Sequence, residues 1–204
     1  MVILQSDYAG AVAYALERLR TELSPDLLYH NLWHTEHDVI PSALRLARLT
    51  DHVEEEDVRL LEVAAAYHDL GFVEQAQDHE MIGARLAAQT LPAFGFSSRQ
   101  VERIMGLLLA TRLPQSPRTI LEQILADADL DVLGRDDFFP RNAALLQESI
   151  RLGRPFTQVE WDRQQLNFVQ KHTYFTAAAR ALRDAGKQQH IAQLEERLRR
   201  AGDL

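Results

Sequence analysis

The chain has 204 residues, no cysteine, and 30 acidic against 22 basic side chains, which gives a formal net charge of −8. The lack of thiols excludes disulfide scaffolds, thiolate zinc sites, iron–sulfur clusters and cysteine nucleophiles, so any metal must be held by histidine and carboxylate groups. The acidic balance argues against a surface built to neutralise the phosphates of a nucleic acid polymer.

Apolar residues recur at spacings of three and four almost throughout, and no run alternates in the manner of a β-strand, which predicts an all-α protein. In chain order, the predicted helices cover 7–23, a segment starting near Thr35, 54–71, 79–90, a segment capped by Ser97 or Ser98, a segment started by Ser116-Pro117 and stopped by Gly134, and closing helices from Thr157 to Gly186 and over 187–201. Thr35 with Asp38, and Thr157 with Glu160, resemble capping boxes. Pro41 is expected to kink its helix or delay its start.

The chain shows neither an internal repeat nor a flexible linker, so we expect residues 1–204 to form a single helical domain, with a separate lobe after about residue 136 as the alternative. No apolar run is long enough to cross a bilayer. The opening MVILQSDYAG has no basic segment followed by a long apolar stretch. We therefore expect a cytoplasmic protein without a membrane partner. The last helix is interpreted as a solvated surface, with a homodimer contact as the alternative.

His68 and Asp69 form the most informative pair of residues. His68 follows three apolar residues of its helix at spacings of seven, four and three, which predicts that the imidazole lies on the buried face. A core histidine with a satisfied hydrogen bond is the alternative. The adjacent Asp69 favours a functional role, because a carboxylate buried without a partner is costly.

Residues 124–134 hold three carboxylates in a segment otherwise suited to a buried helix. At roughly 100° per residue, Asp129 lies inside the apolar arc, whereas Asp127 and Asp131 lie on the polar side. A carboxylate directed into the core needs a cation, so Asp129 is the candidate ligand. Asp127 is an alternate ligand, a group that supports the ligands from outside, or a solvated group. For all three carboxylates, the alternative is an acidic helix face.

His34 lies just ahead of a predicted helix start, where side chains can point into a cleft, and His30 and His37 compete with it. Together, two imidazoles and two carboxylates make a site that suits Mn, Fe, Co, Ni, Mg or Zn. The candidate set is His34, His68, Asp69 and Asp129. A divalent ion in such a site leaves coordination positions open for water and a substrate oxygen.

The order H…HD…D of these residues resembles the HD-domain superfamily of metal-dependent phosphohydrolases. The surrounding segments YHNLWHT, AAYHDLG, HEMIGA and DADLDVLGRDDF strengthen the resemblance, which covers roughly residues 25–140. The chain looks like the branch described as predicted metal-dependent HD-superfamily phosphohydrolases. The resemblance implies an all-α, HD-domain-like helical bundle over about 25–140, with a C-terminal helical extension over about 141–204. It implies that a divalent ion is held by His34, His68, Asp69 and Asp129.

Family members with two metals carry further histidines after the HD pair. His79 stands where the first of these is expected, but Thr111 and Arg112 stand near the later position. His79 is therefore an alternate ligand, a helix cap or a group that binds an outer water. The chain also lacks the signature of cyclic-di-nucleotide phosphodiesterases.

The resemblance implies hydrolysis of a phosphate ester or anhydride in a nucleotide or other small phosphorylated metabolite, with Asp69 as the catalytic group that orients the water. Arg112 and Arg135 are the candidates to bind phosphate, and each has the alternative of being a solvated partner of a helix end. Two other functions are weighed against hydrolysis. One is a non-catalytic sensory domain that binds a nucleotide or metal, and the other is a di-iron HD oxygenase.

Overall fold

A computed structural model describes residues 6–203, and every regular element in that range is a helix, so the prediction of an all-α fold is confirmed. The nine α-helices of this range are α1 (Tyr8–Glu22), α2 (Ile40–Arg48), α3 (Glu55–Tyr67), α4 (His79–Thr90), α5 (Ser98–Ala110), α6 (Ile120–Asp129), α7 (Phe138–Arg151), α8 (Gln158–Lys171) and α9 (Ala177–Arg200). The first five residues of the sequence, on which part of the signal-peptide argument rests, and residue 204 lie outside it. None of the described helices has the length and apolar character that a membrane span requires.

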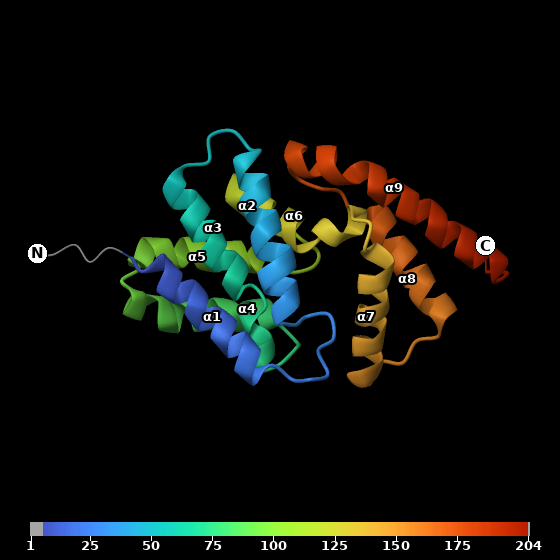
Figure 1. The fold of residues 1–204 in the computed structure, drawn as a ribbon, viewed down its shortest axis with the longest axis horizontal. Helices are drawn as coiled ribbons and strands as arrows, with labels where there is room; N and C mark the ends of the chain where they lie inside the picture. The colour runs from blue at the N-terminus through green and yellow to red at the C-terminus, as the bar shows by residue number, and fades with distance from the viewer. Residues whose placement is uncertain (1–5, 204) are drawn as a thin grey trace, which may run out of the picture.

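Helix α3 is the centre of the N-terminal bundle. Its first turn carries three acidic side chains, whose negative charge suits a helix N-terminus. Its last eight residues are almost all buried. Helices α1, α2 and α5 pack directly on α3, and α4 and α6 pack on α5 (Figure 1). The burial of these last eight residues accounts for the nearly continuous apolar sequence of the second half of α3.

Helix α3 ends at Tyr67, before the predicted end at Gly71, and a 3₁₀ turn (η2) follows over Leu70–Val73. Close packing explains the need for glycine in this turn, because a Cβ on Gly71 would lie 1.9 Å from the carbonyl oxygen of His79. His68 and Asp69 therefore lie where the α-helix gives way to a tighter turn.

The segment that carries His34 is a π-helix (η1) over His34–Val39, continuous with α2. The predicted capping box of Thr35 with Asp38 is wrong. Helical geometry is already present before Thr35, and the Thr35 hydroxyl is buried without a hydrogen-bond partner among the described residues. Regular α-helical geometry begins only at Ile40, one residue before Pro41, which has no N–H to donate to the preceding turn. Single π turns inside helices often accompany functional sites.

Three helices begin with a capping box, in which a hydroxyl and a side-chain carbonyl or carboxylate satisfy each other's backbone N–H groups. The pairs are Ser97 with Gln100, Thr119 with Glu122, and Thr157 with Glu160. The predicted starts at Ser97 and Thr157 are confirmed. The predicted start at Ser116-Pro117 is wrong, because Thr119 supplies the cap and α6 begins at Ile120. Helix α6 also ends at Asp129, and a 3₁₀ turn (η4) over Asp131–Gly134 leads to the predicted stop.

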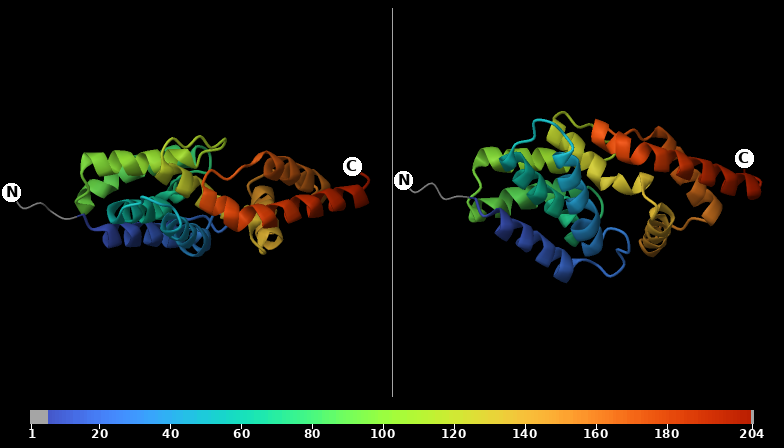
Figure 2. Two further views of the ribbon diagram at one scale, coloured as in Figure 1. Left: turned by 90° about the horizontal axis from the view of Figure 1, so that it is seen from above. Right: turned by 45° about the horizontal axis from the view of Figure 1, so that its top comes forward.

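Helices α7, α8 and α9 form a second group at the end of the molecule opposite the N-terminus (Figures 1 and 2). Helix α9 packs on α8 and on η4, which joins this group to the bundle. The predicted break after Gly186 is wrong, since α9 runs through it without interruption. A Cβ on Gly186 would lie 2.2 Å from the carbonyl oxygen of Gly134, so glycine is needed here for close approach of the two backbones and not to end a helix.

Candidate metal centre

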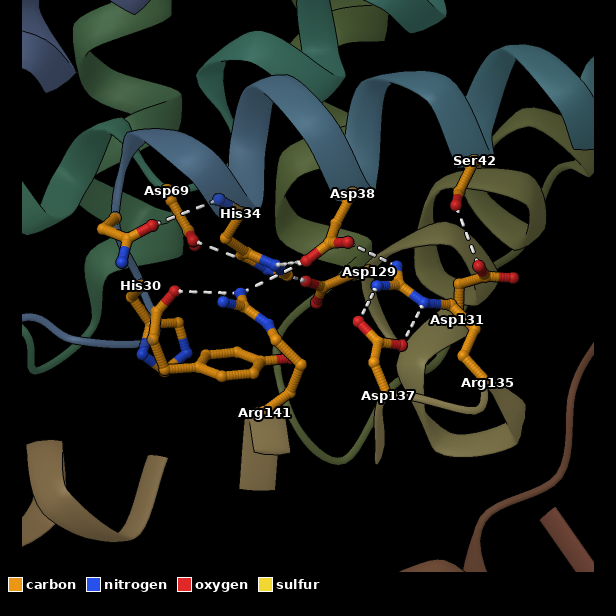
Figure 3. Close-up of polar contacts among 12 residues, drawn as sticks. His30, His34, Asp38, Ser42, Asp69, Asp129, Asp131, Arg135, Asp137 and Arg141 are labelled. Atoms are coloured by element: carbon orange, nitrogen blue, oxygen red, sulfur yellow. Dashed lines mark hydrogen bonds and ion pairs between the residues drawn. The ribbon is translucent and has the colours of Figure 1, made fainter. Parts of the chain in front are cut away.

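Three irregular points in the helical bundle bring the candidate ligands together, and Figure 3 shows three of these ligands, His34, Asp69 and Asp129. His34 comes from the π turn ahead of α2, His68 and Asp69 follow the last residue of α3, and Asp129 is the last residue of α6. Because α2, α3 and α6 pack against one another, these points meet at one place. The end of a helix frees the side chain from the regular helical direction, which explains why the cluster forms at helix ends.

The distances within this cluster suit a single cation. Ligand atoms of His34, His68 and Asp129 all lie within 4.8 Å of one another. Asp129 Oδ1 is 3.4 Å from His34 Nε2 and 3.6 Å from His68 Nε2. Asp69 Oδ2 is 3.1 Å from His68 Nε2 and 3.9 Å from His34 Nε2. Ligand atoms held about 2.0–2.2 Å from one ion lie about 3 to 4 Å apart, so His34, His68 and Asp129 fit a divalent ion, and Asp69 lies directly beside them.

Three of these ligand atoms are buried and lack hydrogen-bond partners within residues 6–203: His34 Nε2, His68 Nε2 and Asp69 Oδ2. The residues that carry them are at most 3% exposed. A buried polar atom without a partner costs about 1–3 kcal/mol, and here three such atoms converge on one point. A donor set of imidazole nitrogens and carboxylate oxygens is the chemistry that Mn, Fe, Co, Ni or Zn accepts. The residues present therefore fit a divalent metal ion.

Hydrogen bonds on the far side of each imidazole orient the rings. His68 Nδ1 lies 2.8 Å from the carbonyl oxygen of Ala65, so Nδ1 carries the proton that it donates. His34 Nδ1 lies 3.4 Å from Asp38 Oδ2. In both rings this arrangement leaves the Nε2 lone pair directed at the cluster, as in metal-binding histidines whose other nitrogen is held by a carbonyl or carboxylate.

The charges of the cluster are strongly coupled. Burial works against protonation of His68, but the adjacent Asp69 carboxylate outweighs it and raises the pKa of His68 to about 9. The pKa of His34 is also raised in spite of burial, by contacts with Asp129 and Asp38. Burial alone would raise the pKa of Asp69, but His68 holds it well below its usual range. The carboxylates thus make a negative environment that favours positive charge at the two Nε2 atoms.

The structure distinguishes the two registers of the Ala-Asp-Ala-Asp segment. Asp127 has no exposed surface and faces away from the cluster. Its carboxylate accepts hydrogen bonds from the N–H groups of Phe175 and Thr176 at 2.8 Å and from the Thr176 hydroxyl at 2.7 Å. It therefore anchors the segment ahead of α9, and burial raises its pKa. The side chain of Asp129 is 21% exposed, toward the cavity described below.

The predicted polar side of this segment is wrong for Asp127 and for Asp131, since both are buried. Asp131 is 1% exposed and accepts a two-pronged ion pair from Arg183 of α9, at 2.7 and 2.9 Å. Arg45 and the Ser42 hydroxyl also donate to it, each at 2.9 Å. Burial would raise the pKa of Asp131, but Arg183 outweighs it and lowers the pKa. These partners come from distant parts of the chain, so the spacing of residues along one helix could not predict them.

His79 and His30 lie beside the cluster. His79 Nε2 is 3.6 Å from Asp69 Oδ1, and the rings of His79 and His30 both stack on Phe72. His79 is the first residue of α4 but not its cap, which is Asp78. His30 is bound by the buried Glu148 at 2.5 Å, and the N–H groups of residues 29 and 30 donate to the same carboxylate. Glu148 thus holds the loop ahead of the π turn, a role that its sequence context did not signal.

The arginines near the cluster are arranged differently from the prediction. Arg112 is half exposed, pairs with Asp78 at 2.7 Å and does not line the cavity. Arg135 binds Asp38 and Asp137 and faces a separate surface hollow. Arg141 of α7 is the arginine that reaches the cavity. Its Nη2 lies 3.2 Å from Asp38 Oδ2, and its guanidinium lies 4.7 Å from the ring centres of Tyr29 and Trp33.

A cavity of about 320 Å³ lies between the cluster and the C-terminal helices. Asp69, His79, Glu80 and Asp129 line it from the bundle, whereas α7 and α8 supply Arg141, Asn142, Leu145, Gln164, Gln165 and Phe168. No local motif in the sequence marks these six C-terminal residues, and only the packing of α7 and α8 brings them to the site.

The chain was compared with known proteins. Residues 39–131 match the model of the HD domain, a range that includes His68, Asp69 and Asp129 and begins five residues after His34. The structure is similar to the crystal structure of a predicted HD superfamily hydrolase from an uncultured Thermotogales bacterium, with a TM-score of 0.59 and 20% sequence identity over 94% of this chain and 89% of that one. No curated protein matches the chain significantly.

Proposed function

Because this chain belongs to the HD-domain superfamily, we propose that it is a hydrolase, and more specifically a metal-dependent phosphohydrolase of a nucleotide or other small phosphorylated metabolite. The observation that carries the proposal is the set of three buried, unpartnered atoms, from His34, His68 and Asp69, that converge beside Asp129. The similar Thermotogales protein is named as a predicted hydrolase, which supports the same reaction class.

His34, His68, Asp69 and Asp129 would hold the metal ion. A divalent ion, when bound, polarises a phosphoryl oxygen and lowers the pKa of a water. Asp69 directs Oδ2 toward the two imidazoles and Oδ1 toward His79, 3.6 Å away. Its second oxygen can therefore orient the attacking water.

Arg141 is the group proposed to receive the phosphate. It lines the cavity together with Asp69 and Asp129, and its Nε atom is buried without a hydrogen-bond partner among the described residues. A guanidinium stacked on aromatic rings is held in one orientation, which suits it to bind phosphate oxygens. Arg112 and Arg135 are less suited, because neither of them lines the cavity.

Metal analysis followed by a phosphate-release screen with Mn, Co, Ni and Mg tests the proposal. We expect one exchangeable divalent ion per chain, loss of phosphate release in chelator, and loss of both properties in His68→Ala. The control is His37→Ala, whose side chain is 55% exposed and lies outside the cluster. Two irons per chain would instead indicate the oxygenase, and metal binding without turnover would indicate the sensory domain. Full occupancy and activity in His68→Ala would contradict the site.

Asp38 is expected to position His34, so Asp38→Asn should weaken metal binding by about 10- to 100-fold. Asp38 is 4% exposed and lies beside His34 Nδ1, with Arg135 and Arg141 on its other side. The measurement is a competitive metal titration against a chelating dye. Asp137→Asn is the matched control, because Asp137 also binds Arg135 but does not contact His34. Equal effects of the two substitutions would assign the loss to Arg135 and not to His34.

A further inference from the structure

We propose that α7 and α8 select the substrate, and that it is a phosphate monoester of a flat ring system whose edge carries hydrogen-bonding groups. The inference rests on the proposed function and narrows its substrate class. It concerns the cavity wall that α7 and α8 supply, and both of these helices lie outside residues 39–131, the range that matches the HD domain.

Two buried amides face this cavity without a full set of partners. Gln165 is 8% exposed, lines the cavity, and makes no side-chain hydrogen bond to any residue in the range 6–203. Asn142 is 6% exposed. Its Oδ1 accepts from Trp161 Nε1 at 3.0 Å, while its NH₂ group has no partner within the same range. The unpaired polar atoms of both amides are accessible from the cavity, so they can bind a ligand that offers donors and acceptors along one edge.

The remaining wall is apolar. The side chains concerned are Leu130, Val132, Leu133, Phe138, Leu145 and Phe168. Small-molecule sites typically combine such a wall with a few placed polar groups that fix orientation. A flat ring places its faces against aliphatic and aromatic side chains and its edge against the amides. An open-chain polyol does not suit this wall, because its hydroxyls would be buried without partners.

The charge of the cavity limits the ligand to one phosphate. Arg141 is the one lysine or arginine among the described residues that line it, and three carboxylates, Asp69, Glu80 and Asp129, line it as well. One phosphate is matched by the guanidinium and the metal ion. A second or third phosphate would add negative charge beside carboxylates and apolar groups with no further fixed cation, which is unfavourable in a partly buried site.

Substrate preference is the first test. Phosphate release by the wild-type protein would be measured with adenosine 5′-monophosphate and pyridoxal 5′-phosphate, which represent two sources of a ring with a polar edge, and with glycerol 3-phosphate and adenosine diphosphate. We expect kcat/KM for at least one ring monoester to exceed the values for glycerol 3-phosphate and the diphosphate by roughly tenfold or more. Equal or higher kcat/KM with glycerol 3-phosphate would contradict the proposal that the substrate contains a ring. A preference for the diphosphate would contradict the proposal that it carries one phosphate.

Gln165→Leu tests the amide, since leucine has a similar volume and suits the apolar wall. We expect the KM of the preferred ring monoester to rise by about tenfold, the loss of roughly one to two hydrogen bonds, whereas the KM of phenyl phosphate, which has no polar edge, stays the same. Gln170→Leu on the same helix is the control, because Gln170 is exposed and bonds to Glu195. Equal changes for both substrates, or none for the ring monoester, would overturn the assignment of Gln165.

A binding measurement separates this inference from the proposed function. Saturation-transfer NMR on metal-free protein would use adenosine and pyridoxine, which carry no phosphate. We expect transfer to at least one of them in the wild type and its loss in Gln165→Leu. Such binding without phosphate release from any compound would contradict the proposed phosphohydrolase activity and support the ring-binding site. Phosphate release without ring binding or ring preference would contradict the ring-binding site and support the phosphohydrolase activity.

Discussion

Replacing Asp129 with asparagine is expected to remove the metal ion and to lower phosphate release by at least about 100-fold. Asp129 Oδ1 lies within 3.4 to 3.6 Å of both imidazole nitrogens of the cluster. An asparagine keeps the size of the side chain but loses the negative charge that a divalent ion requires. Changes to residues that only orient ligands already lower metal affinity or activity by about 10- to 100-fold. Loss of a ligand is expected to have a larger effect. Metal content per chain and the rate of phosphate release are the two measurements.

Asp127→Asn is the matched control, with the same chemical change two residues away. We expect normal metal content and a free energy of unfolding lowered by about 1–3 kcal/mol. The Asp127 carboxylate accepts three hydrogen bonds from Phe175 and Thr176, and an asparagine would direct an NH₂ group at some of these donors. Urea unfolding checks the stability. Metal loss in Asp127→Asn with full metal in Asp129→Asn would reverse the assignment of the ligand.

Gly186→Ala is expected to lower the free energy of unfolding by at least about 2 kcal/mol. Alanine normally stabilises a helix interior relative to glycine, by about 0.5–1 kcal/mol. Here a Cβ would lie 2.2 Å from the carbonyl oxygen of Gly134 and 3.0 Å from its carbon, so α9 must shift away from η4. The same shift would strain the ion pair of Asp131 with Arg183, which also joins α9 to the bundle.

Gly106→Ala in α5 gives the opposite sign for the same substitution. The nearest atom to a Cβ at this position is Glu122 Oε1 at 3.6 Å, an ordinary contact. We expect the free energy of unfolding to rise by about 0.5–1 kcal/mol, from the reduced backbone freedom of the unfolded chain. Chemical denaturation of both variants is the measurement. If Gly186→Ala stabilised the protein as well, helix propensity and not close packing would govern that position.

Much of the helical architecture follows from local patterns in the sequence. The spacing of apolar residues predicts helices, and Ser97 and Thr157 cap theirs as expected. Predictions from local signals were wrong where tertiary packing determines the conformation. Thr35 is buried in a π turn, and Gly186 lies inside a helix where two backbones meet. Capping residues and glycines act locally in many helices, but burial against a distant segment outweighs their local preference.

The candidate cluster shows the same division. His34, His68, Asp69 and Asp129 were named from the sequence by burial and by resemblance, and the structure brings their atoms together. Helical-face spacing singled out Asp129 but placed Asp127 and Asp131 on the polar side, because the groups that bury these two carboxylates come from distant parts of the chain.

By itself, the sequence determined the helical class and the lack of thiol chemistry, since these depend on composition and short-range spacing, and its resemblance to the HD-domain superfamily singled out four candidate ligands. Only the tertiary structure decided which arginine reaches the cavity and which amides line it. Arg141 and Gln165 lie on helices that carry no local motif for a site. They come to the site because α9 is held on η4 through Asp131 and Gly134, contacts between residues about fifty positions apart in the chain.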